Sequence, residues 1–242
     1  MKFKKNIKKT IRLSLAPFIV ADYVRFTKRN DGRFKFSFLD IYPCIKDKTI
    51  QTGFDRHYVY HTSWAARKVR EINPKYHTDI SSSLFFSGIV SAFVPVKFYD
   101  YRPAEIILNN LESLQADLLK LPFENNSVTS LSCMHVVEHV GLGRYGEPMD
   151  PQGDLKAIGE LKRVLAKDGS LLFVVPIGKE AKIEFNAHRI YTYEQIMKYF
   201  SELILKEFAL IPEKSGGVVL GKEAVDMLKN ENYACGCFLF VK

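Results

Sequence analysis

Short apolar runs alternate with longer amphipathic segments along most of this 242-residue chain. Apolar runs rich in β-branched residues predict strands, and apolar residues spaced three or four apart predict helices. The predicted strands are residues 76–80, 96–100, 114–116, 128–134, 170–176, 203–211 and 233–241. The predicted helices are residues 58–72, 87–93, 155–165, 192–200 and 224–228.

Repeated strand–helix units with strongly apolar strands predict an α/β fold, with a mostly parallel sheet covered by helices on both faces. Hydrophobic residues make up 47% of the chain, which is enough for one substantial core. We therefore predict one α/β domain over residues 57–242. Residues 31–56 are irregular and aromatic-rich, and we interpret them as a connector or a cap.

Residues 1–30 hold the entire excess of positive charge. They contain nine Lys and Arg residues against one acid, Asp22, and this net charge of +8 equals that of the whole chain. Because the rest of the chain is neutral, we predict no nucleic-acid partner. An apolar stripe with helical spacing runs through this arm: Phe3, Ile7, Ile11, Leu15 and Phe18. The arm is either a basic amphipathic helix on an anionic membrane surface or a solvated helix packed on the domain.

The cysteines and the apolar segments bear on the compartment. No pair among the four cysteines has C-x-x-C spacing, so buried free thiols in a reducing cytosol are the favoured interpretation. The apolar run 13–20 is short for a signal peptide, and no run reaches the ~18 residues of a membrane span. We predict a cytoplasmic protein, peripheral at the inner membrane face if the arm binds lipid.

The most specific motif order lies in residues 116–178. It begins with A-D-L-L-K-L-P-F, continues through a strand into H-V-V-E-H-V-G, and ends with a helix and the strand L-L-F-V-V-P. This order resembles the second half of the class I S-adenosylmethionine-dependent methyltransferases. The resemblance implies a doubly wound, mostly parallel, seven-stranded Rossmann-like sheet whose last two strands form a hairpin-like pair. It also implies that S-adenosylmethionine lies over the carboxyl ends of the strands.

The resemblance assigns cofactor-binding residues to three strand ends. Asp79 closes the first strand, Asp100 ends the second at the place of the ribose-binding acid, and Asp117 falls near the adenine edge. Glycines are expected at Ser81, Ser83 and Phe85, and this chain lacks them. Ser81, Ser82 and Ser83 are instead predicted to hold the methionine carboxylate through hydroxyl and backbone N–H groups.

A narrower resemblance is to the DUF268 family, methyltransferase-like proteins associated with bacterial surface-polysaccharide genes. The residues that carry it are W-A-A-R-K-V at 64–69, D-I-S-S-S at 79–83, the segment 135–153 and E-F-N-A-H-R at 184–189. The resemblance implies methylation of a sugar or a lipid-linked glycan in surface-polysaccharide synthesis.

A sugar hydroxyl is a poor nucleophile, and a general base accelerates its attack by about 10²–10⁴-fold. His135, His139 and His188 are the candidate bases, because a neutral imidazole is available near pH 7. For each histidine, capping a helix or satisfying a buried backbone group is an equally weighted alternative.

The loop 141–153 contains four glycines and two prolines, and it predicts an acceptor-binding lid beside the cleft. Arg144 in this loop and Arg189 after the fifth predicted strand suit an acceptor that carries a phosphate or a carboxylate. The residues assigned to the acceptor are Glu138, Arg144, Tyr145, Asp150, Asn186 and Arg189.

Two other functions stay open. The missing glycines favour a catalytically inactive methyltransferase fold that serves as a binding or scaffold subunit. The H-V-V-E-H motif at 135–139 also matches the inverted zinc-peptidase pattern, with His135 and His139 sharing zinc on a helix, Glu138 as base and Glu207 or Glu213 as a third ligand. We rank this hydrolase third and assign no metal ligand.

Overall fold

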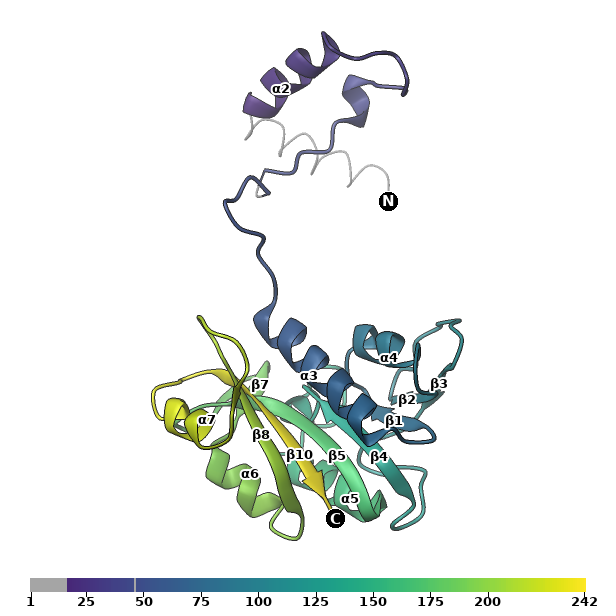
Figure 1. The fold of residues 1–242 in the computed structure, drawn as a ribbon, viewed down its shortest axis with the longest axis vertical. Helices are drawn as coiled ribbons and strands as arrows, with labels where there is room; N and C mark the ends of the chain where they lie inside the picture. Colours follow the sequence, from purple (N-terminus) through teal and green to yellow (C-terminus); the bar gives the residue numbers. More distant parts are fainter. Residues whose placement is uncertain (1–16, 46) are drawn as a thin grey trace. The chain divides into compact units, whose positions relative to one another are not determined.

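An eight-stranded sheet forms the centre of residues 55–242 in the computed structural model, which describes residues 17–45 and 47–242 (Figure 1). The strand order is β3-β2-β1-β4-β5-β10-β8-β9. The strands are β1 (His77–Ile80), β2 (Val96–Asp100), β3 (Leu111–Gln115), β4 (Val128–Met134), β5 (Leu165–Ile177), β8 (Ile204–Pro212), β9 (Val219–Leu220) and β10 (Ala234–Val241). The first five are parallel neighbours, whereas β10 lies antiparallel between β5 and β8. The predicted doubly wound α/β fold is confirmed, with the short β9 as an extra edge strand.

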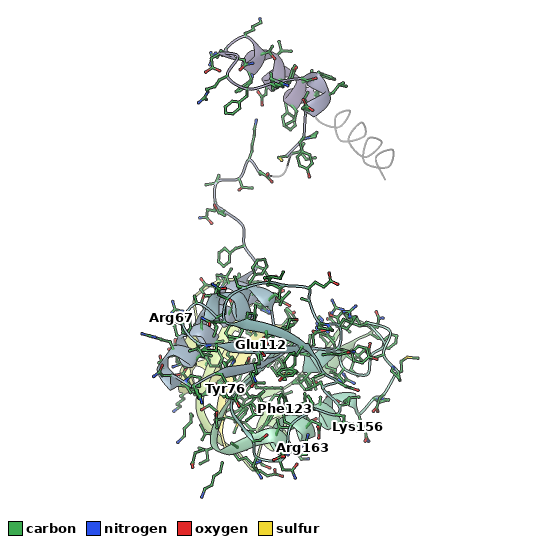
Figure 2. The ribbon with its side chains drawn as sticks, turned by 90° about the vertical axis from the view of Figure 1, so that its right-hand side faces the viewer. Arg67, Tyr76, Glu112, Phe123, Lys156 and Arg163 are labelled. Carbon is green, nitrogen blue, oxygen red and sulfur yellow. The ribbon has the colours of Figure 1, made fainter. Side chains whose placement is uncertain are left out.

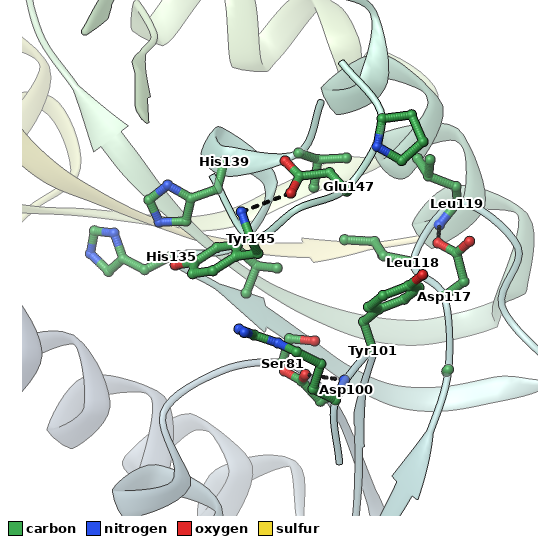
Figure 3. Close-up of a pocket in the computed structure, with 15 residues that line it drawn as sticks. Ser81, Asp100, Tyr101, Asp117, Leu118, Leu119, His135, His139, Tyr145 and Glu147 are labelled. Atoms are coloured by element: carbon green, nitrogen blue, oxygen red, sulfur yellow. Dashed lines mark hydrogen bonds between the residues drawn. The ribbon is translucent and has the colours of Figure 1, made fainter. Parts of the chain in front are cut away.

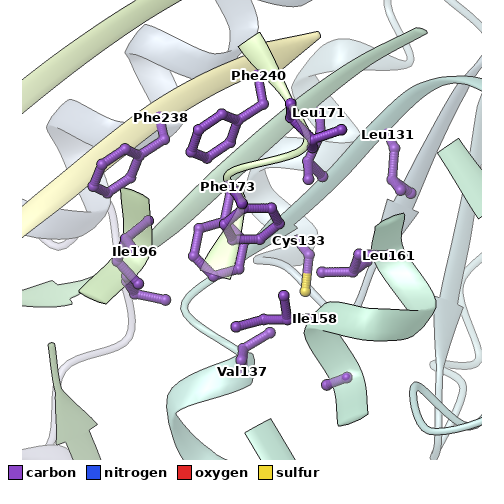
Figure 4. Close-up of a cluster of buried hydrophobic side chains, with 14 of the residues drawn as sticks. Leu131, Cys133, Val137, Ile158, Leu161, Leu171, Phe173, Ile196, Phe238 and Phe240 are labelled. Carbon is purple, nitrogen blue, oxygen red and sulfur yellow. The ribbon is translucent and has the colours of Figure 1, made fainter. Parts of the chain in front are cut away.

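Side chains of the central strands are buried on both faces. In β5, Leu171, Phe173 and Val175 belong to one hydrophobic core, while Leu172 and Val174 belong to the other. This alternation follows from the two-residue period of a strand, and burial on both faces explains the continuous apolar run in the sequence. Figure 4 shows the first core, where Phe173 lies near Phe238 and Phe240.

Helices cover both faces of the sheet. They are α3 (Arg56–Ile72) and α4 (Leu84–Val90) on one face, and α5 (Gly153–Val164), α6 (Tyr193–Tyr199) and α7 (Gly221–Leu228) on the other. Two parallel layers of helices therefore enclose the sheet and leave its carboxyl edge for loops.

Helix α3 has clear start and stop signals. The carboxylate of Asp55 accepts a hydrogen bond from the backbone N–H of Tyr58 (3.1 Å), and Asn73 ends the helix in the left-handed region at φ 49°. Its buried residues share one face: His57, His61, Trp64, Ala65 and Val69. The helix begins two residues before the predicted start because the cap lies at Asp55.

Other predicted bounds shift for local reasons. The helix expected at residues 87–93 is α4, which begins earlier because Ser83 takes the N-cap position. The hairpin of β6 (Lys182–Glu184) and β7 (His188–Ile190) and the 3₁₀ turn η2 (Val137–His139) were not predicted. At α6, Thr192 forms a capping box with Gln195.

The segment after β3 is fixed to α5 by one side chain. The guanidinium of Arg163 donates to the carbonyls of Leu121 (3.1 Å) and Phe123 (2.8 Å) and pairs with Glu160 at 2.7 Å. Figure 2 labels Arg163 and Phe123 among the side chains of the domain. These bonds hold the L-P-F segment that leads into β4. The loop between β3 and β4 is therefore anchored to α5.

Residues 1–54 cluster as a separate unit, within which residues 17–45 and 47–54 are described. It contains α2 (Pro17–Thr27) and the 3₁₀ turn η1 (Phe38–Asp40), and Tyr23 stacks on Phe36 with ring centroids 4.7 Å apart. Most of the predicted arm helix lies outside the described residues. Among those described, no helix combines the length and the apolarity needed to cross a membrane.

Candidate functional site

A cavity of about 280 Å³ opens at the carboxyl ends of β1, β2, β3 and β4 (Figure 3). It is lined by residues from the turns after these four strands and from the lid: Ser81, Asp100, Tyr101, Arg102, Ala116, Asp117, Leu118, Leu119, His135, Val136, His139, Val140, Tyr145, Glu147 and Pro148. Parallel strands of a doubly wound sheet bring their loops together at this edge, which is where such folds bind ligands.

Two carboxylates lie on the strand-end side of the cavity. One oxygen of Asp100 accepts from the backbone N–H of Arg102 (2.7 Å), and one oxygen of Asp117 accepts from the backbone N–H of Leu119 (2.8 Å). These bonds orient both acids and leave each a second oxygen for a ligand. Asp100 and Asp117 therefore lie where the sequence placed them, at the cavity wall.

The turn after β1 has a backbone conformation that glycine normally adopts. Ser81 has φ 55°, in the left-handed region, although it carries a side chain. Its backbone N–H and its hydroxyl both donate to the carbonyl of Tyr99, at 2.7 and 3.2 Å. The hydroxyl of Ser82 accepts from the N–H of Met134 (3.0 Å), and Ser82 and Ser83 line a shallower neighbouring hollow. Both Ser81 donors are thus used within the protein, and the Ser82 hydroxyl is already engaged by a backbone N–H.

Asp79 lies outside the cavity. It is fully buried in β1 and accepts hydrogen bonds from the hydroxyls of Ser87 and Ser132. Burial raises the pKa of Asp79 to about 6, although these hydrogen bonds lower it in part. The structure corrects the expectation for Asp79, because a carboxylate enclosed by serines within the sheet cannot reach a ligand.

His135 follows β4 with φ 56°, also in the left-handed region. Its Nδ1 lies 2.9 Å from a carboxylate oxygen of Glu138, and its Nε2 lies 3.4 Å from the sulfur of Cys235. The ring also stacks on Tyr58. Burial lowers the pKa of His135 to about 4, so the imidazole is neutral at pH 7.

His139 lies in η2 and lines the cavity. Its Nδ1 lies 2.7 Å from the carbonyl oxygen of Ala187 and 3.1 Å from the Arg144 guanidinium, which itself donates to that carbonyl at 2.9 Å. We assign the tautomer in which Nδ1 donates to Ala187, because this is the shorter contact. Nε2 is then the lone-pair nitrogen. Burial lowers the pKa of His139, partly offset by the Glu138 carboxylate, and the neutral imidazole has the form of a general base.

Glu138 lies between His135 and His139, at 2.9 and 3.8 Å. Burial raises its pKa to about 7, and its second oxygen has no hydrogen-bond partner among the described residues. A buried, unsatisfied carboxyl costs stability and is typical of functional sites. His188, on β7, is partly buried near His139 but does not line the cavity.

The lid closes over the cavity with Tyr145. The guanidiniums of Arg102 and Arg144 lie 4.9 and 5.2 Å from the centre of its ring. The Glu147 carboxylate accepts from the backbone N–H groups of Gly143 and Tyr145, at 2.8 and 2.9 Å. This arrangement holds an aromatic ring and two positive charges at the rim.

The other assigned acceptor residues do not reach the cavity. Asp150 pairs with Lys156 at 2.6 Å, and Asn186 is exposed. Arg189 is 5% exposed and donates to the carbonyls of Val140 and Pro151, at 2.7 and 3.3 Å. Arg189 therefore stabilises the turn after β4 and is not free to bind an acceptor.

The arrangement of an inverted zinc peptidase is absent from the described H-V-V-E-H segment. His135 precedes the single turn η2 in a left-handed conformation, so His135 and His139 do not share a helical face. Glu207, one nominal third ligand, bonds to Trp64 and Lys68 on the other face of the sheet.

Several residues around the site were missed by the sequence analysis. Arg102 follows the acid at the end of β2, and position alone could have indicated it. His57 and His61 have H-x-x-x-H spacing on the predicted helix, which places both on one face. Their proximity to His135 and Cys235 is a tertiary fact with no sequence signal.

The comparisons with known proteins agree with this architecture. Residues 121–209 match the family model described as "Caenorhabditis protein of unknown function, DUF268". The structure is similar to that of the MccD protein, with a TM-score of 0.54 and 14% identity over 75% of this chain and 96% of that one. No curated protein matches the chain.

Two further solved structures have a TM-score of 0.50. The cyclase SpnF is 12% identical over 74% of this chain and 80% of its own. A geranyl diphosphate C-methyltransferase from Streptomyces coelicolor A3(2), solved with Mg2+, geranyl diphosphate and S-adenosyl-L-homocysteine, is 10% identical over 74% and 78%. Such identities show a shared fold and leave the reaction to the site. Residues 121–209 are therefore similar to the DUF268 family, and the α/β fold of the chain is shared with these solved structures.

Proposed function

We propose that the protein is an S-adenosylmethionine-dependent methyltransferase that methylates a hydroxyl of a sugar or lipid-linked glycan. The observation that carries the proposal is the cavity itself, where Asp100, Asp117 and His139 from three strand ends face one space. Two oriented carboxylates suit the ribose and adenine of the cofactor, and a neutral imidazole suits the acceptor.

The cavity fits the adenosine half of the cofactor better than the expected serine turn fits the methionine half. Asp100 and Asp117 each keep a free oxygen, whereas Ser81 and Ser82 are already hydrogen-bonded. Arg102 lines both the cavity and the neighbouring hollow, and its guanidinium is the charge-matched partner for a methionine carboxylate. We assign that role to Arg102.

Bound S-adenosylmethionine supplies an electrophilic methyl group. On the acceptor side, His139 takes the proton of the attacking hydroxyl at Nε2, while Ala187 fixes the ring through Nδ1. Glu138, whose carboxyl has a pKa raised by burial, stabilises the imidazolium that forms. His135 is a weaker candidate base because both its ring nitrogens are already engaged.

The rim supports an anionic acceptor. With Arg102 assigned to the cofactor, Arg144 places a positive charge beside the Tyr145 ring, which suits a phosphorylated or carboxylated sugar. A role in bacterial surface-polysaccharide synthesis remains part of this proposal.

Isothermal titration calorimetry of the full chain with S-adenosylmethionine and S-adenosylhomocysteine tests the cofactor. We expect saturable binding, weakened at least about 10-fold by Asp100→Asn because one ribose hydrogen bond to a charged acceptor is lost. Asp226→Asn, which changes an acid in α7 far along the chain, is the matched control and should bind normally. Folded protein without heat at millimolar ligand would favour the inactive scaffold instead.

The basic arm supports attachment to an anionic membrane, with about 1 kcal/mol from each basic side chain near the surface. We propose that residues 1–30 hold the enzyme beside a lipid-linked acceptor. Deletion of these residues should release the protein from vesicles that contain anionic lipid, and equal binding of the truncated chain would reject the attachment.

A further inference from the structure

Three metal-ligating side chains converge beneath α3, beside the cavity. Ligand atoms of His57, His135 and Cys235 all lie within 4.8 Å of one another. His57 and Cys235 are 8% and 0% exposed, and the side chain of His135 is 7% exposed. The three come from α3, the turn after β4, and β10, so the fold assembles a group that is widely separated in sequence.

His135 is oriented as a metal ligand within this group. Its Nδ1 donates to the Glu138 carboxylate (2.9 Å), which leaves the lone pair on Nε2 directed toward Cys235 (3.4 Å). A carboxylate that holds the far nitrogen of a histidine is the usual outer partner at zinc sites, where it fixes the tautomer and raises ligand basicity.

The histidines of α3 have unpaired ring nitrogens. Nε2 of His57 and Nε2 of His61 are buried and have no hydrogen-bond partner among the described residues. His61 donates from Nδ1 to the His57 carbonyl (2.6 Å), so its Nε2 is also a lone-pair nitrogen. A buried polar atom without a partner costs about 1–3 kcal/mol, and an ion is one way to satisfy it.

We propose that His57, His135 and Cys235 bind one divalent transition-metal ion, for which zinc is the best match. Two imidazoles and one thiolate form a donor set of borderline softness, which favours zinc over magnesium or calcium. Cys235 loses its thiol proton to solvent as the metal–sulfur bond forms.

The geometry needs only a small adjustment. Bond lengths of about 2.0–2.3 Å place tetrahedral ligand atoms roughly 3.3–3.8 Å apart. The 3.4 Å separation of His135 and Cys235 already lies in that range. The widest separation, at most 4.8 Å, closes by about 1 Å, which a rotation of the His57 ring in the first turn of α3 can supply.

Three protein ligands leave a fourth coordination position, which is the arrangement of catalytic rather than structural zinc. His135 is shared between this group and the cavity wall. The metal would therefore lie at the cavity wall, where a Lewis acid can lower the pKa of an acceptor heteroatom. The binding of the metal itself does not depend on methyl transfer.

Cobalt titration of the full chain, first stripped with a chelator, tests the site without an activity assay. We expect one Co2+ per chain, a thiolate-to-cobalt charge-transfer band, and displacement by one equivalent of Zn2+. Cys235→Ser should abolish the band and lower zinc affinity at least about 100-fold, and Glu138→Gln should lower the affinity about 10–100-fold through its effect on His135.

Matched cysteine variants decide the assignment. Cys237→Ser changes the thiol 3.9 Å from Cys235, and Cys44→Ser changes an exposed thiol in the N-terminal unit; both should keep the band and the stoichiometry. His57→Gln should lower zinc affinity about as much as Cys235→Ser, and it replaces that variant if the latter does not fold. Folded protein without a cobalt band, or a band that survives Cys235→Ser, would overturn the proposal.

Discussion

The turns after β1 and β4 adopt the same unusual backbone and use their polar groups in opposite ways. Ser81 has φ 55° and His135 has φ 56°, and neither is glycine. After β1, the serines and Asp79 bond to one another and to the backbone. After β4, Glu138 keeps an unpaired oxygen and His139 lines the cavity.

This difference indicates that the turn after β1 serves stability and that the turn after β4 serves chemistry. A satisfied polar network rigidifies a fold, whereas unpaired buried groups cost stability and persist where they act on a ligand. We infer that the first turn is a rigid structural turn of the sheet and that the second turn carries the reactive groups. The degenerate serine loop is then less damaging to catalysis than its sequence suggests.

The strongest test of this comparison is Asp79→Ala. It leaves the hydroxyls of Ser87 and Ser132 without their buried acceptor and creates a small cavity, so we expect a loss of about 4 kcal/mol in the free energy of unfolding. Urea denaturation measures it. Asp117→Ala, an exposed acid after β3, should cost about 1 kcal/mol or less, and equal losses would contradict a structural first turn.

Arg189→Met tests how the second turn is held. Removal of the guanidinium leaves the carbonyls of Val140 and Pro151 unpaired and the nearby Asp154 carboxylate uncompensated, so we expect a loss of about 3 kcal/mol in thermal or urea unfolding. Arg144→Met, at the exposed rim, should change stability by under about 0.5 kcal/mol. A small effect of Arg189→Met would mean that the turn does not depend on β7.

The pH dependence of the free energy of unfolding measures the contribution of Asp79. Its folded pKa of about 6 exceeds the ordinary value of 3.8, so the folded state binds the proton more tightly than the unfolded state. Its contribution is therefore largest below pH 4 and falls by roughly 2–3 kcal/mol as the pH rises through 6. Asp79→Asn should remove that part of the pH slope in parallel urea titrations. An unchanged slope would show that other groups produce it.

Ser81→Gly has the smallest expected effect. Glycine relieves the left-handed strain at φ 55° but loses the hydroxyl bond to Tyr99, so we expect a gain of about 1 kcal/mol at most. Ser83→Gly is the matched control, because φ −65° there is ordinary and glycine should cost a few tenths of a kcal/mol. If both variants lose stability equally, Ser81 is not strained.

Much of the fold was predictable from local pattern. The bounds of β2 and β4 match the sequence prediction, because short runs with apolar positions between polar or turn-forming segments are typical of buried strands. The bounds of α4 were displaced because a serine cap competes with hydrophobic spacing. The hairpin of β6 and β7 was missed because strands of three residues are too short for a periodic signal, and β6 is exposed as well.

The candidate site likewise contains residues that the sequence could place and residues that only packing could place. Asp100 and Asp117 were placed by their position at strand ends, which the sequence determines once the strands are known. Asp79 and Arg189 do not line the cavity, and only packing shows that one is enclosed by serines and that the other bonds to backbone carbonyls.

The sequence by itself determined the α/β order and the edge of the sheet where ligands bind, since hydrophobic period and strand direction are local properties. The tertiary structure alone decided which polar groups are satisfied and which face a cavity. It also brought His57, His135 and Cys235 together across 178 residues of chain, because proximity between distant segments depends on how helices and strands pack.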